Sequence, residues 1–258
     1  MRARRLVIAM PKGGSGKTAT ATALAWGFHR MGKRVLLVDL DSQGNATAAM
    51  GVAPGWGYGA LEFLLRPDQA FVPATVADGL DVVPASSWRS GLDLEVQKAN
   101  QLTGPVTLRE AIDRVQDAYD HVLVDCAPSL GPVTYNALAA GAILAPVEMT
   151  RLSVSVTPEL DRVVATLRRS VTPAAAVIGY LPTRYVERLS ESREALRALV
   201  ALEGERVLRT RVPFATAIAR GLAEARSPFC RSYHRSKGPD AYLHVVEEVT
   251  ALLEEHHG

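Results

Sequence analysis

Long apolar runs are missing from this sequence of 258 residues. No stretch approaches the roughly 20 consecutive apolar residues that a membrane-spanning helix requires. The N-terminus is basic, but the apolar run that follows extends only from Leu6 to Met10 before a glycine-rich stretch begins. We therefore expect neither a signal peptide nor a membrane anchor, and we expect a cytoplasmic protein.

The chain is also poor in cysteine and in net charge. Its two cysteines, Cys126 and Cys230, are too few for a disulfide framework or a four-cysteine metal site, and they fit a reducing compartment. The chain carries 29 basic and 27 acidic residues, which gives a net charge of +2. A balance this close to neutral identifies no partner, so the distribution of charge along the chain is more informative.

What the sequence does contain is an alternation of short apolar runs and longer helix-like segments. The runs predicted as strands are Leu6–Met10, Val35–Asp39, Leu80–Pro84, His121–Asp125, Ile143–Val147 and Ala175–Leu181. The predicted helices are Lys17–Met31, Thr107–Ala118, Thr134–Ala140, Thr157–Ser170, Ser190–Leu202, Ala217–Ala225 and Asp240–Glu255. Most of the runs lack polar alternation, which is typical of parallel strands buried on both faces. The pattern predicts a doubly wound α/β fold, with a mostly parallel sheet and helices on both faces, in one domain spanning residues 1–258.

A glycine-rich loop between the first predicted strand and the first predicted helix is the strongest functional signal. It reads Pro11, Lys12, Gly13, Gly14, Ser15, Gly16, Lys17, Thr18. Glycines let backbone N–H groups turn toward an anion, and the following helix adds the positive end of its dipole. Lys17 is predicted to contact the β- and γ-phosphates of a nucleotide, and the Thr18 hydroxyl to bind Mg²⁺. The alternative is a plain glycine-rich turn with lysines nearby, which the strand and helix context disfavours.

The loop departs from the usual phosphate-loop pattern at its start, where Pro11 replaces a glycine and Lys12 adds a second lysine. In this respect it resembles the deviant phosphate loop of the ParA/MinD family of ATPases. The resemblance implies ATP and Mg²⁺ as cofactors and a homodimer with ATP at its interface, where Lys12 reaches the nucleotide of the partner subunit. The alternative for Lys12 is a solvated loop lysine. Gly13, Gly14, Ser15, Gly16 and Ala19 are assigned to the nucleotide on the same basis; Ala19 lacks the hydroxyl that many relatives direct at the α-phosphate.

Asp39 ends the second predicted strand, and Asp41 follows two residues later, so the two share a face where the chain is extended. The resemblance implies that Asp41 positions or activates the attacking water and that Asp39 supports the Mg²⁺ shell. Gln43, Gly44 and Asn45 then form a switch loop that senses the γ-phosphate. A strand that merely ends in a polar turn is the alternative.

Asp125 ends the fourth predicted strand and resembles a Walker B carboxylate, which holds Mg²⁺ through water. Asn136 matches a recurrent asparagine of the family. Thr183, Arg184 and Pro213 fall where relatives contact adenine. The resemblance covers nearly the whole chain and is strongest over residues 5–50 and 120–150.

Positive charge is concentrated near the C-terminus. Between Arg209 and Gly238 there are seven basic residues and one acidic residue, Glu224. Such a patch can follow a phosphate backbone, and short ParA-type proteins bind DNA non-specifically through C-terminal basic residues. The predicted DNA contacts are Arg220, Arg226, Arg231 and Arg235. A solvated arginine-rich surface is the alternative.

These features predict an ATPase that dimerises with ATP, binds double-stranded DNA non-specifically, and drives segregation of a plasmid or chromosome. A ParB-like partner would stimulate hydrolysis, and the protein would be associated with the nucleoid. A MinD-like membrane-surface ATPase is the alternative; the acidic polar face of the final segment, YLHVVEEVTALLEEHHG, disfavours it. A reductase resembling the nitrogenase iron protein needs two suitably placed cysteines, which Cys126 and Cys230 are not. No helix-turn-helix precedes the loop, so we do not expect site-specific operator binding.

Overall fold

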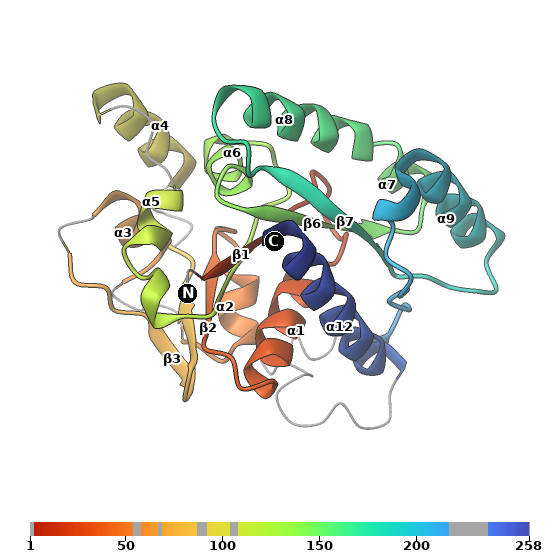
Figure 1. The fold of residues 1–258 in the computed structure, drawn as a ribbon, viewed down its shortest axis with the longest axis horizontal. Helices are drawn as coiled ribbons and strands as arrows, with labels where there is room; N and C mark the ends of the chain where they lie inside the picture. Colours follow the sequence, from red (N-terminus) through yellow and green to blue (C-terminus); the bar gives the residue numbers. More distant parts are fainter. Residues whose placement is uncertain are drawn as a thin grey trace.

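Figure 1 shows a computed structural model of the chain, which describes residues 3–53, 58–66, 69–86, 92–103, 108–216 and 237–257. Within these residues, seven strands form one sheet in the order β3-β4-β2-β5-β1-β6-β7. The strands are β1 (Arg4–Ile8), β2 (Val35–Asp39), β3 (Ala74–Ala77), β4 (Leu80–Val83), β5 (His121–Asp125), β6 (Ala142–Glu148) and β7 (Ala176–Thr183). Every pairing is parallel except that of β3 with β4. The predicted doubly wound α/β fold is confirmed, and all six predicted strands are present.

The helices cover both faces of this sheet. They are α1 (Lys17–Arg30), α2 (Asn45–Ala49), α3 (Ala60–Leu65), α4 (Leu92–Thr103), α5 (Leu108–Asp113), α6 (Pro132–Leu138), α7 (Arg151–Val154), α8 (Thr157–Ser170), α9 (Ser190–Glu203) and α12 (Lys237–His257), with short 3₁₀ turns η2 (Gln116–Ala118) and η3 (Gly204–Arg206). The predicted helix Ala217–Ala225 lies outside the described residues.

One predicted helix, Thr107–Ala118, is wrong as a continuous element. The α-helix ends at Asp113, and the chain turns before the 3₁₀ turn η2 begins at Gln116. Arg5, on β1, contacts the side chains of both Asp113 and Gln116 and so ties this break to the sheet. The break therefore depends on a contact with a residue more than 100 positions away, which local sequence does not reveal.

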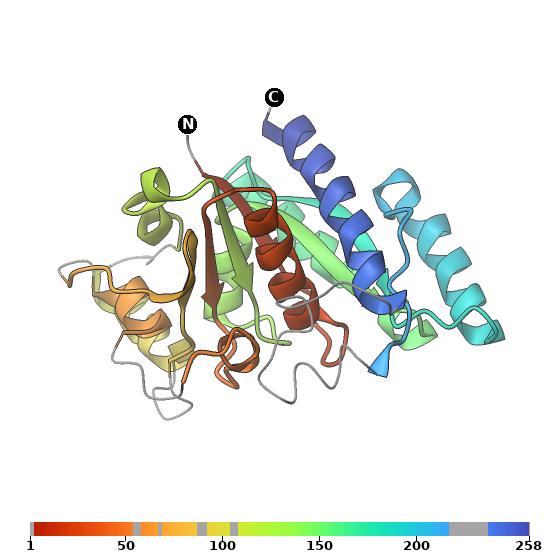
Figure 2. The ribbon, with the colours of Figure 1, turned by 90° about the horizontal axis from the view of Figure 1, so that it is seen from below.

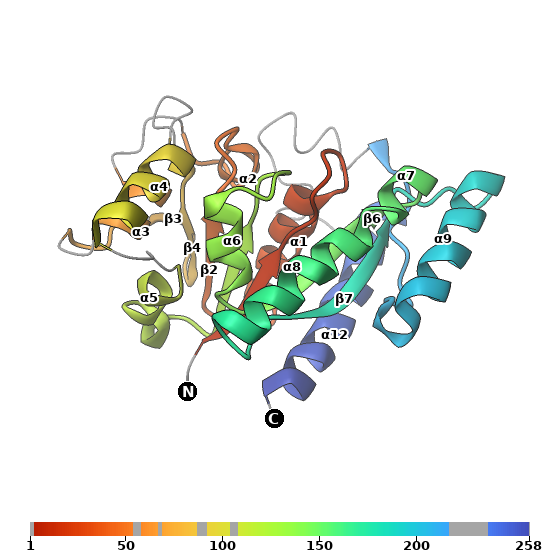
Figure 3. The same ribbon diagram turned by 90° about the horizontal axis from the view of Figure 1, so that it is seen from above.

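Along the central strands, successive side chains enter two separate cores. On β1, Leu6 and Ile8 pack with residues of α1 and α12, whereas Val7 packs with residues of α6 and α8. Figures 2 and 3 show these helix pairs on opposite faces of the sheet. All three β1 side chains are fully buried. This is why the predicted strands are apolar at consecutive positions rather than at every second one.

Helices α1 and α12 lie side by side on one face of the sheet (Figure 2). α1 is rich in alanine, which favours helix, but it contains a glycine, Gly27, at the contact with α12. A Cβ atom at position 27 would lie 2.3 Å from Cγ2 of Val246. Val246 is buried and β-branched, so its side chain has few alternative rotamers. The glycine therefore sets how closely α12 approaches α1.

We expect Gly27→Ala to destabilise the protein by roughly 1–3 kcal/mol, because the added methyl group overpacks the contact with Val246. This loss outweighs the gain of about 1 kcal/mol that alanine brings to a helix interior. Chemical denaturation of Gly27→Ala, Val246→Ala and the double variant measures the effect. In the Val246→Ala background the alanine at position 27 should cost nothing; an equal cost in both backgrounds would contradict the assignment.

Candidate nucleotide site

Three neighbouring strands bring the predicted site together. β2, β5 and β1 are adjacent and parallel, so their carboxyl ends meet at one edge of the sheet. Asp125 is in register with Asp39 on one side and with Ile8 on the other. The glycine-rich loop leaves β1 immediately after Ile8. Local sequence thus places each group at a strand end, and strand order places the ends together.

The loop has the backbone of an anion-binding turn. Gly14 and Gly16 have φ values of 75° and 93°, in the left-handed region where residues with a Cβ atom are strained. Gly16 is the N-cap of α1, and no side chain caps the helix there. The first N–H groups of α1 are therefore available to an anion.

The loop forms one wall of a cavity of about 500 Å³. Residues 13–19 line it together with Asp41, Gln43, Asn45, Pro128, Arg184, residues 212–215 and Tyr242. Most of the predicted nucleotide residues are thus around one cavity, including Arg184 and Pro213. Sequence reasoning missed Val212, Phe214, Ala215 and Tyr242, because these residues carry no motif and reach the cavity only through the packing of the C-terminal part of the chain.

Lys17 lies inside the loop. Its side chain is buried, and its Nζ donates to the carbonyl oxygens of Lys12 at 2.8 Å and Met10 at 3.2 Å. Burial lowers the pKa of Lys17, and the nearby carboxyl group of Asp125 partly offsets this effect. The ammonium group is therefore held beside the cavity before any ligand arrives.

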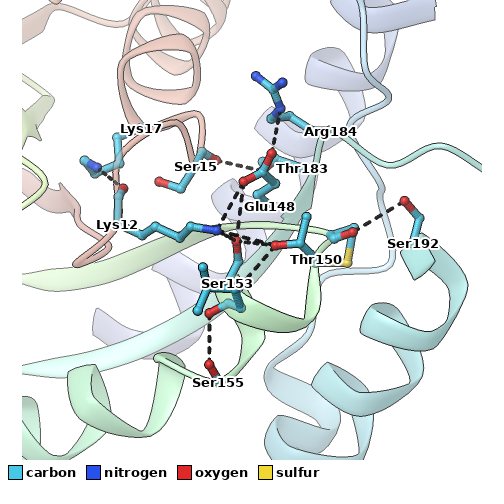
Figure 4. Close-up of polar contacts among 12 residues, drawn as sticks. Lys12, Ser15, Lys17, Glu148, Thr150, Ser153, Ser155, Thr183, Arg184 and Ser192 are labelled. Atoms are coloured by element: carbon cyan, nitrogen blue, oxygen red, sulfur yellow. Dashed lines mark hydrogen bonds and ion pairs between the residues drawn. The ribbon is translucent and has the colours of Figure 1, made fainter.

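Lys12 extends in another direction and does not line the cavity. Its Nζ contacts Ser153 Oγ at 2.5 Å, Thr150 Oγ1 at 3.4 Å and Glu148 Oε2 at 3.4 Å (Figure 4). Glu148 also binds Nε of Arg184 through its other oxygen, at 3.0 Å. Lys12 is thus held by the β6–α7 segment of its own subunit and is not a solvated loop lysine.

Asp125 and Thr18 form the candidate metal site. Thr18 Oγ1 donates to Oδ2 of Asp125 at 2.8 Å. Oδ1 of the same carboxyl group is buried and has no hydrogen-bond partner among the described residues. Burial, followed by repulsion from Asp39, raises the pKa of Asp125 well above its usual value. A buried carboxyl group with an unpaired oxygen fits a cation, which would favour its ionised form.

Both carboxylate oxygens of Asp39 accept hydrogen bonds from the segment that follows β2. Its Oδ1 accepts from the backbone N–H of Asp41 at 3.1 Å, and its Oδ2 accepts from the backbone and hydroxyl of Thr47 at 2.8 and 2.7 Å. Burial raises the pKa of Asp39 to about 6. Asp41 lines the cavity, and its Oδ1 accepts from the backbone N–H of Gln43 at 3.0 Å. Asp39 therefore fixes the loop that carries Asp41.

The arrangement fits Mg²⁺ better than a metal held by protein alone. No group of three or more His, Cys, Asp or Glu side chains within the described ranges has a metal-binding arrangement. Mg²⁺ is usually held by one or two carboxylates, together with waters and the phosphates of a nucleotide. Thr18 and Asp125, beside the phosphate loop, provide that limited set of protein oxygens.

Besides Lys12, two predicted nucleotide residues do not line the cavity. Thr183 donates through its hydroxyl to the carbonyl oxygen of Ser15 at 2.7 Å and so supports the loop (Figure 4). Its side chain fills the space beside Gly16, where an added Cβ atom would lie 3.5 Å from Cγ2 of Thr183. Asn136 donates to the carbonyl oxygen of Pro132, within its own helix α6, at 3.1 Å.

Arg184 does line the cavity, and its backbone has a φ of 51°, which is rare for a residue with a side chain. Its guanidinium group lies 4.8 Å from the centre of the Phe214 ring. Pro213 adjoins this pair, because its backbone bridges to Tyr185. Arg184, Pro213 and Phe214 together form a partly aromatic section of the cavity wall.

The predicted DNA contacts Arg220, Arg226, Arg231 and Arg235 lie outside the described residues. Two other members of the basic stretch, Arg209 and Arg211, are described and exposed. Among the helices that the structure describes, none is both long and apolar enough to span a bilayer.

A family model described as "AAA domain" (AAA_31) matches residues 3–176. The chain is also 35% identical to the chromosome-partitioning ATPase Soj of Thermus thermophilus, over 98% of this chain and 97% of that protein. The chain belongs to the ParA/Soj/MinD family of ATPases. The predicted resemblance is thereby confirmed.

Other relatives agree with this assignment. The chain is 31% identical to the chromosome partitioning protein ParA of Caulobacter vibrioides, over 95% of this chain and 93% of the relative. Among solved structures, cobyrinic acid a,c-diamide synthase of Mycobacterium smegmatis, with a bound ATP analogue and magnesium, has a TM-score of 0.77 and 28% identity. The match covers 96% of this chain and 94% of that one.

The buried carboxyl pair predicts a pH dependence in the absence of nucleotide. A carboxyl group whose pKa rises from 3.8 to about 6 on folding binds more protons in the native state. Its stabilising contribution is complete below the unfolded pKa and is lost as the pH rises through about 6, by roughly 3 kcal/mol. We expect a smaller decline in Asp125→Asn, because the neutral amide removes repulsion between the two groups.

Urea unfolding of the nucleotide-free protein at several pH values between about 4 and 8 tests this expectation, because the stabilising contribution is lost between the unfolded pKa of 3.8 and the folded pKa of about 6. Asp125→Asn should be the more stable protein at the upper end of the range. Asp117→Asn, which changes an exposed carboxylate, is the matched control and should keep the slope of the unaltered chain. Equal slopes for all three proteins would show that the buried pair does not carry the pH dependence.

Proposed function

We propose that this chain is an ATP-dependent partition ATPase, a single-domain protein that dimerises with ATP and moves DNA. The observation that carries the proposal is one loop with two lysines in different positions. Lys17 is held beside the cavity, whereas Lys12 is held outside it on a separate set of side chains. Similarity to Soj and ParA proteins over nearly the whole chain supports the same function.

ATP with Mg²⁺ is the proposed ligand of the cavity. The backbone of residues 13–19 and the Lys17 ammonium group would hold the phosphates, and Arg184, Pro213 and Phe214 would face the base. Thr18 and Asp125 would hold Mg²⁺, with Asp39 behind them. Bound Mg²⁺ neutralises negative charge on the β- and γ-phosphates. Asp41 is proposed to orient the attacking water, because it lines the cavity beside the loop and is fixed by Asp39.

The proposed role of Lys12 requires it to leave its present position. A lysine that contacts the nucleotide of a partner subunit has to break its contacts with Glu148, Thr150 and Ser153. These contacts compete with dimerisation, and phosphate oxygens at the interface would replace them. Lys12 would then supply positive charge in trans, as an arginine finger does.

Replacing the two lysines should give different defects. Lys17→Ala removes a charge-assisted phosphate contact, which costs roughly 1.5–3 kcal/mol, or about 10- to 150-fold in ATP affinity. Lys12→Ala should bind ATP within about 3-fold of the unaltered chain but should not dimerise, because its contact is made across the interface. Titration with a fluorescent ATP analogue and light scattering measure the two effects.

Glu148→Gln is the informative companion to Lys12→Ala, because it weakens the hold on Lys12 and keeps the lysine. It should dimerise at a lower protein concentration than the unaltered chain. If Lys12→Ala dimerises and turns over ATP normally, Lys12 does not act across an interface.

We propose that the protein binds DNA non-specifically. A ParB-like protein is the proposed partner that stimulates ATP hydrolysis. The basic stretch after Arg209 supports DNA binding, with Arg220, Arg226, Arg231 and Arg235 as the proposed phosphate contacts. Dimerisation would double the basic surface offered to one duplex, so ATP would switch DNA binding on. The proposal places the protein in the cytoplasm, on the nucleoid.

Binding to DNA of unrelated sequence should require ATP and should weaken with salt. If each subunit neutralises about three phosphates, the logarithm of affinity should fall against the logarithm of salt concentration with a slope near −5. A filter-binding series with ATP, with ADP and without nucleotide measures this slope. The Asp41→Ala variant, which we expect to bind ATP without hydrolysing it, keeps the ATP state stable.

Changing two of the four arginines to Glu should abolish DNA binding and spare ATP-dependent dimerisation. Two outcomes contradict the proposal: DNA binding that is indifferent to nucleotide, and ATP-dependent binding to lipid vesicles in place of DNA. The second outcome would favour the membrane-surface function of MinD-like proteins.

A further inference from the structure

The C-terminal helix contributes a residue to the nucleotide cavity. Tyr242, in the second turn of α12, lines the cavity together with residues of the phosphate loop and is only 1% exposed. Tyr242 is far from the loop in sequence, because 222 positions separate it from Thr20. Nothing in the family motifs of this chain involves Tyr242.

The hydroxyl group of Tyr242 is fixed to the first turn of α1. It lies 3.0 Å from Oγ1 of Thr20, and both groups are buried. The backbone N–H of Thr20 donates to the carbonyl oxygen of Gly16 at 2.9 Å, so Thr20 belongs to the turn that opens at the phosphate loop. Ala19, the residue before it, lines the cavity. Tyr242 therefore lines the cavity and is bonded through its hydroxyl group to the helix that begins at the loop.

A second contact joins α12 to the opposite part of the cavity wall. Glu248, on α12, accepts hydrogen bonds from the backbone N–H groups of Arg209 at 2.9 Å and Thr210 at 2.8 Å. These residues lead directly into residues 212–215, which line the cavity. Between Tyr242 and Glu248 on α12, Val246 packs against Gly27 of α1. The helix is thus attached to two walls of the cavity and packed along α1.

We propose that Tyr242 is a positioning residue that couples nucleotide binding to the packing of α12 on α1. A ligand in the cavity bears on the Tyr242 ring, and the hydrogen bond to Thr20 transmits its position to both helices. The coupling is reciprocal, so loosening α12 weakens nucleotide binding to the same extent that nucleotide binding tightens α12. This inference rests on the proposed ATP site but not on DNA binding.

The proposed coupling also affects the basic stretch, because that stretch lies in the chain between two segments that line the cavity. The chain passes from the cavity wall at Ala215 into residues 217–236, which contain the four proposed DNA contacts, and then enters α12 and returns to the cavity at Tyr242. Both ends of the stretch are therefore attached to cavity walls. Nucleotide occupancy acts on both attachments at once.

Tyr242→Phe tests the proposal, because it keeps the ring and removes the hydrogen bond. The unaltered chain should show slower amide hydrogen exchange in α12 when a non-hydrolysable ATP analogue and Mg²⁺ are added. Tyr242→Phe should bind the analogue about 5-fold more weakly, the effect of one lost hydrogen bond, and should lose most of the nucleotide-dependent protection of α12.

Tyr119→Phe is the matched control. Tyr119 is also buried, and its hydroxyl donates to Oδ2 of Asp81 at 2.7 Å, but it does not line the cavity. This variant should lose stability by a similar amount and should keep both the affinity and the nucleotide-dependent protection. Thr20→Val removes the Tyr242 bond from the other side, so it should repeat the effect of Tyr242→Phe, and the double variant should be no worse than either single one.

The proposal is overturned if the unaltered chain saturates with nucleotide and α12 exchanges at an unchanged rate. It is also overturned if Tyr242→Phe and Thr20→Val keep full affinity and full protection, or if Tyr119→Phe shows the same loss as Tyr242→Phe. Failure of the unaltered chain to bind the analogue at all would instead contradict the ATP site, and the coupling with it.

Discussion

The register between β2 and β5 sets Asp39 directly beside Asp125, and the rest of the site depends on this burial of two carboxyl groups. Neither group is exposed; burial raises the pKa of both, and repulsion from Asp39 raises that of Asp125 further. Two buried acids at this distance are stable only when hydrogen bonds, protons or a cation compensate them. Asp39 accepts three hydrogen bonds. Asp125 accepts one, from the hydroxyl of Thr18, and its other oxygen has no partner among the described residues. Because of this difference, Asp39 shapes the loop that follows it, whereas Asp125 is available to a ligand.

Glu148, at the end of β6, also connects two parts of the site. One of its oxygens holds Lys12, and the other holds Arg184, which forms part of the cavity wall with Phe214. A single carboxylate therefore contacts both the lysine proposed to act on a partner and the wall proposed to face the base. Because the two contacts use different oxygens of one rigid group, a shift of Arg184 changes the surroundings of Lys12. In the proposed function, contact of the base with Arg184 and release of Lys12 would therefore be linked through Glu148.

The parts of the site that sequence predicted are those whose signal is local. The loop from Pro11 to Thr18 is contiguous, and Asp39 and Asp125 each end an apolar run, so strand prediction and motif coincide. The same holds for the fold, because two apolar faces leave an unbroken run of aliphatic residues. Sequence did not predict the antiparallel strand β3, which has only four residues and an ordinary composition. Nor did it predict Tyr242, Phe214 or the hold of Glu148 on Lys12, because these depend on how distant segments pack. Only the packing shows that the hydroxyl of Thr183, which was predicted to contact adenine, donates to the carbonyl oxygen of Ser15 in the loop.

The two outer strands of the sheet affect how copies of this protein can meet. At one edge, β3 is four residues long, runs against its neighbour and has an irregular register between Thr75 and Ala77. At the other edge, the chain after η3 covers β7, where Leu208 and Val212 donate to the carbonyl oxygens of Tyr180 and Pro182. A short irregular strand and a covered strand both resist edge-to-edge pairing, which is the usual route to aggregation of sheet proteins. For a protein proposed to dimerise through its nucleotide-binding loops, sheet edges of this kind leave those loops as the surface at which a second copy can bind.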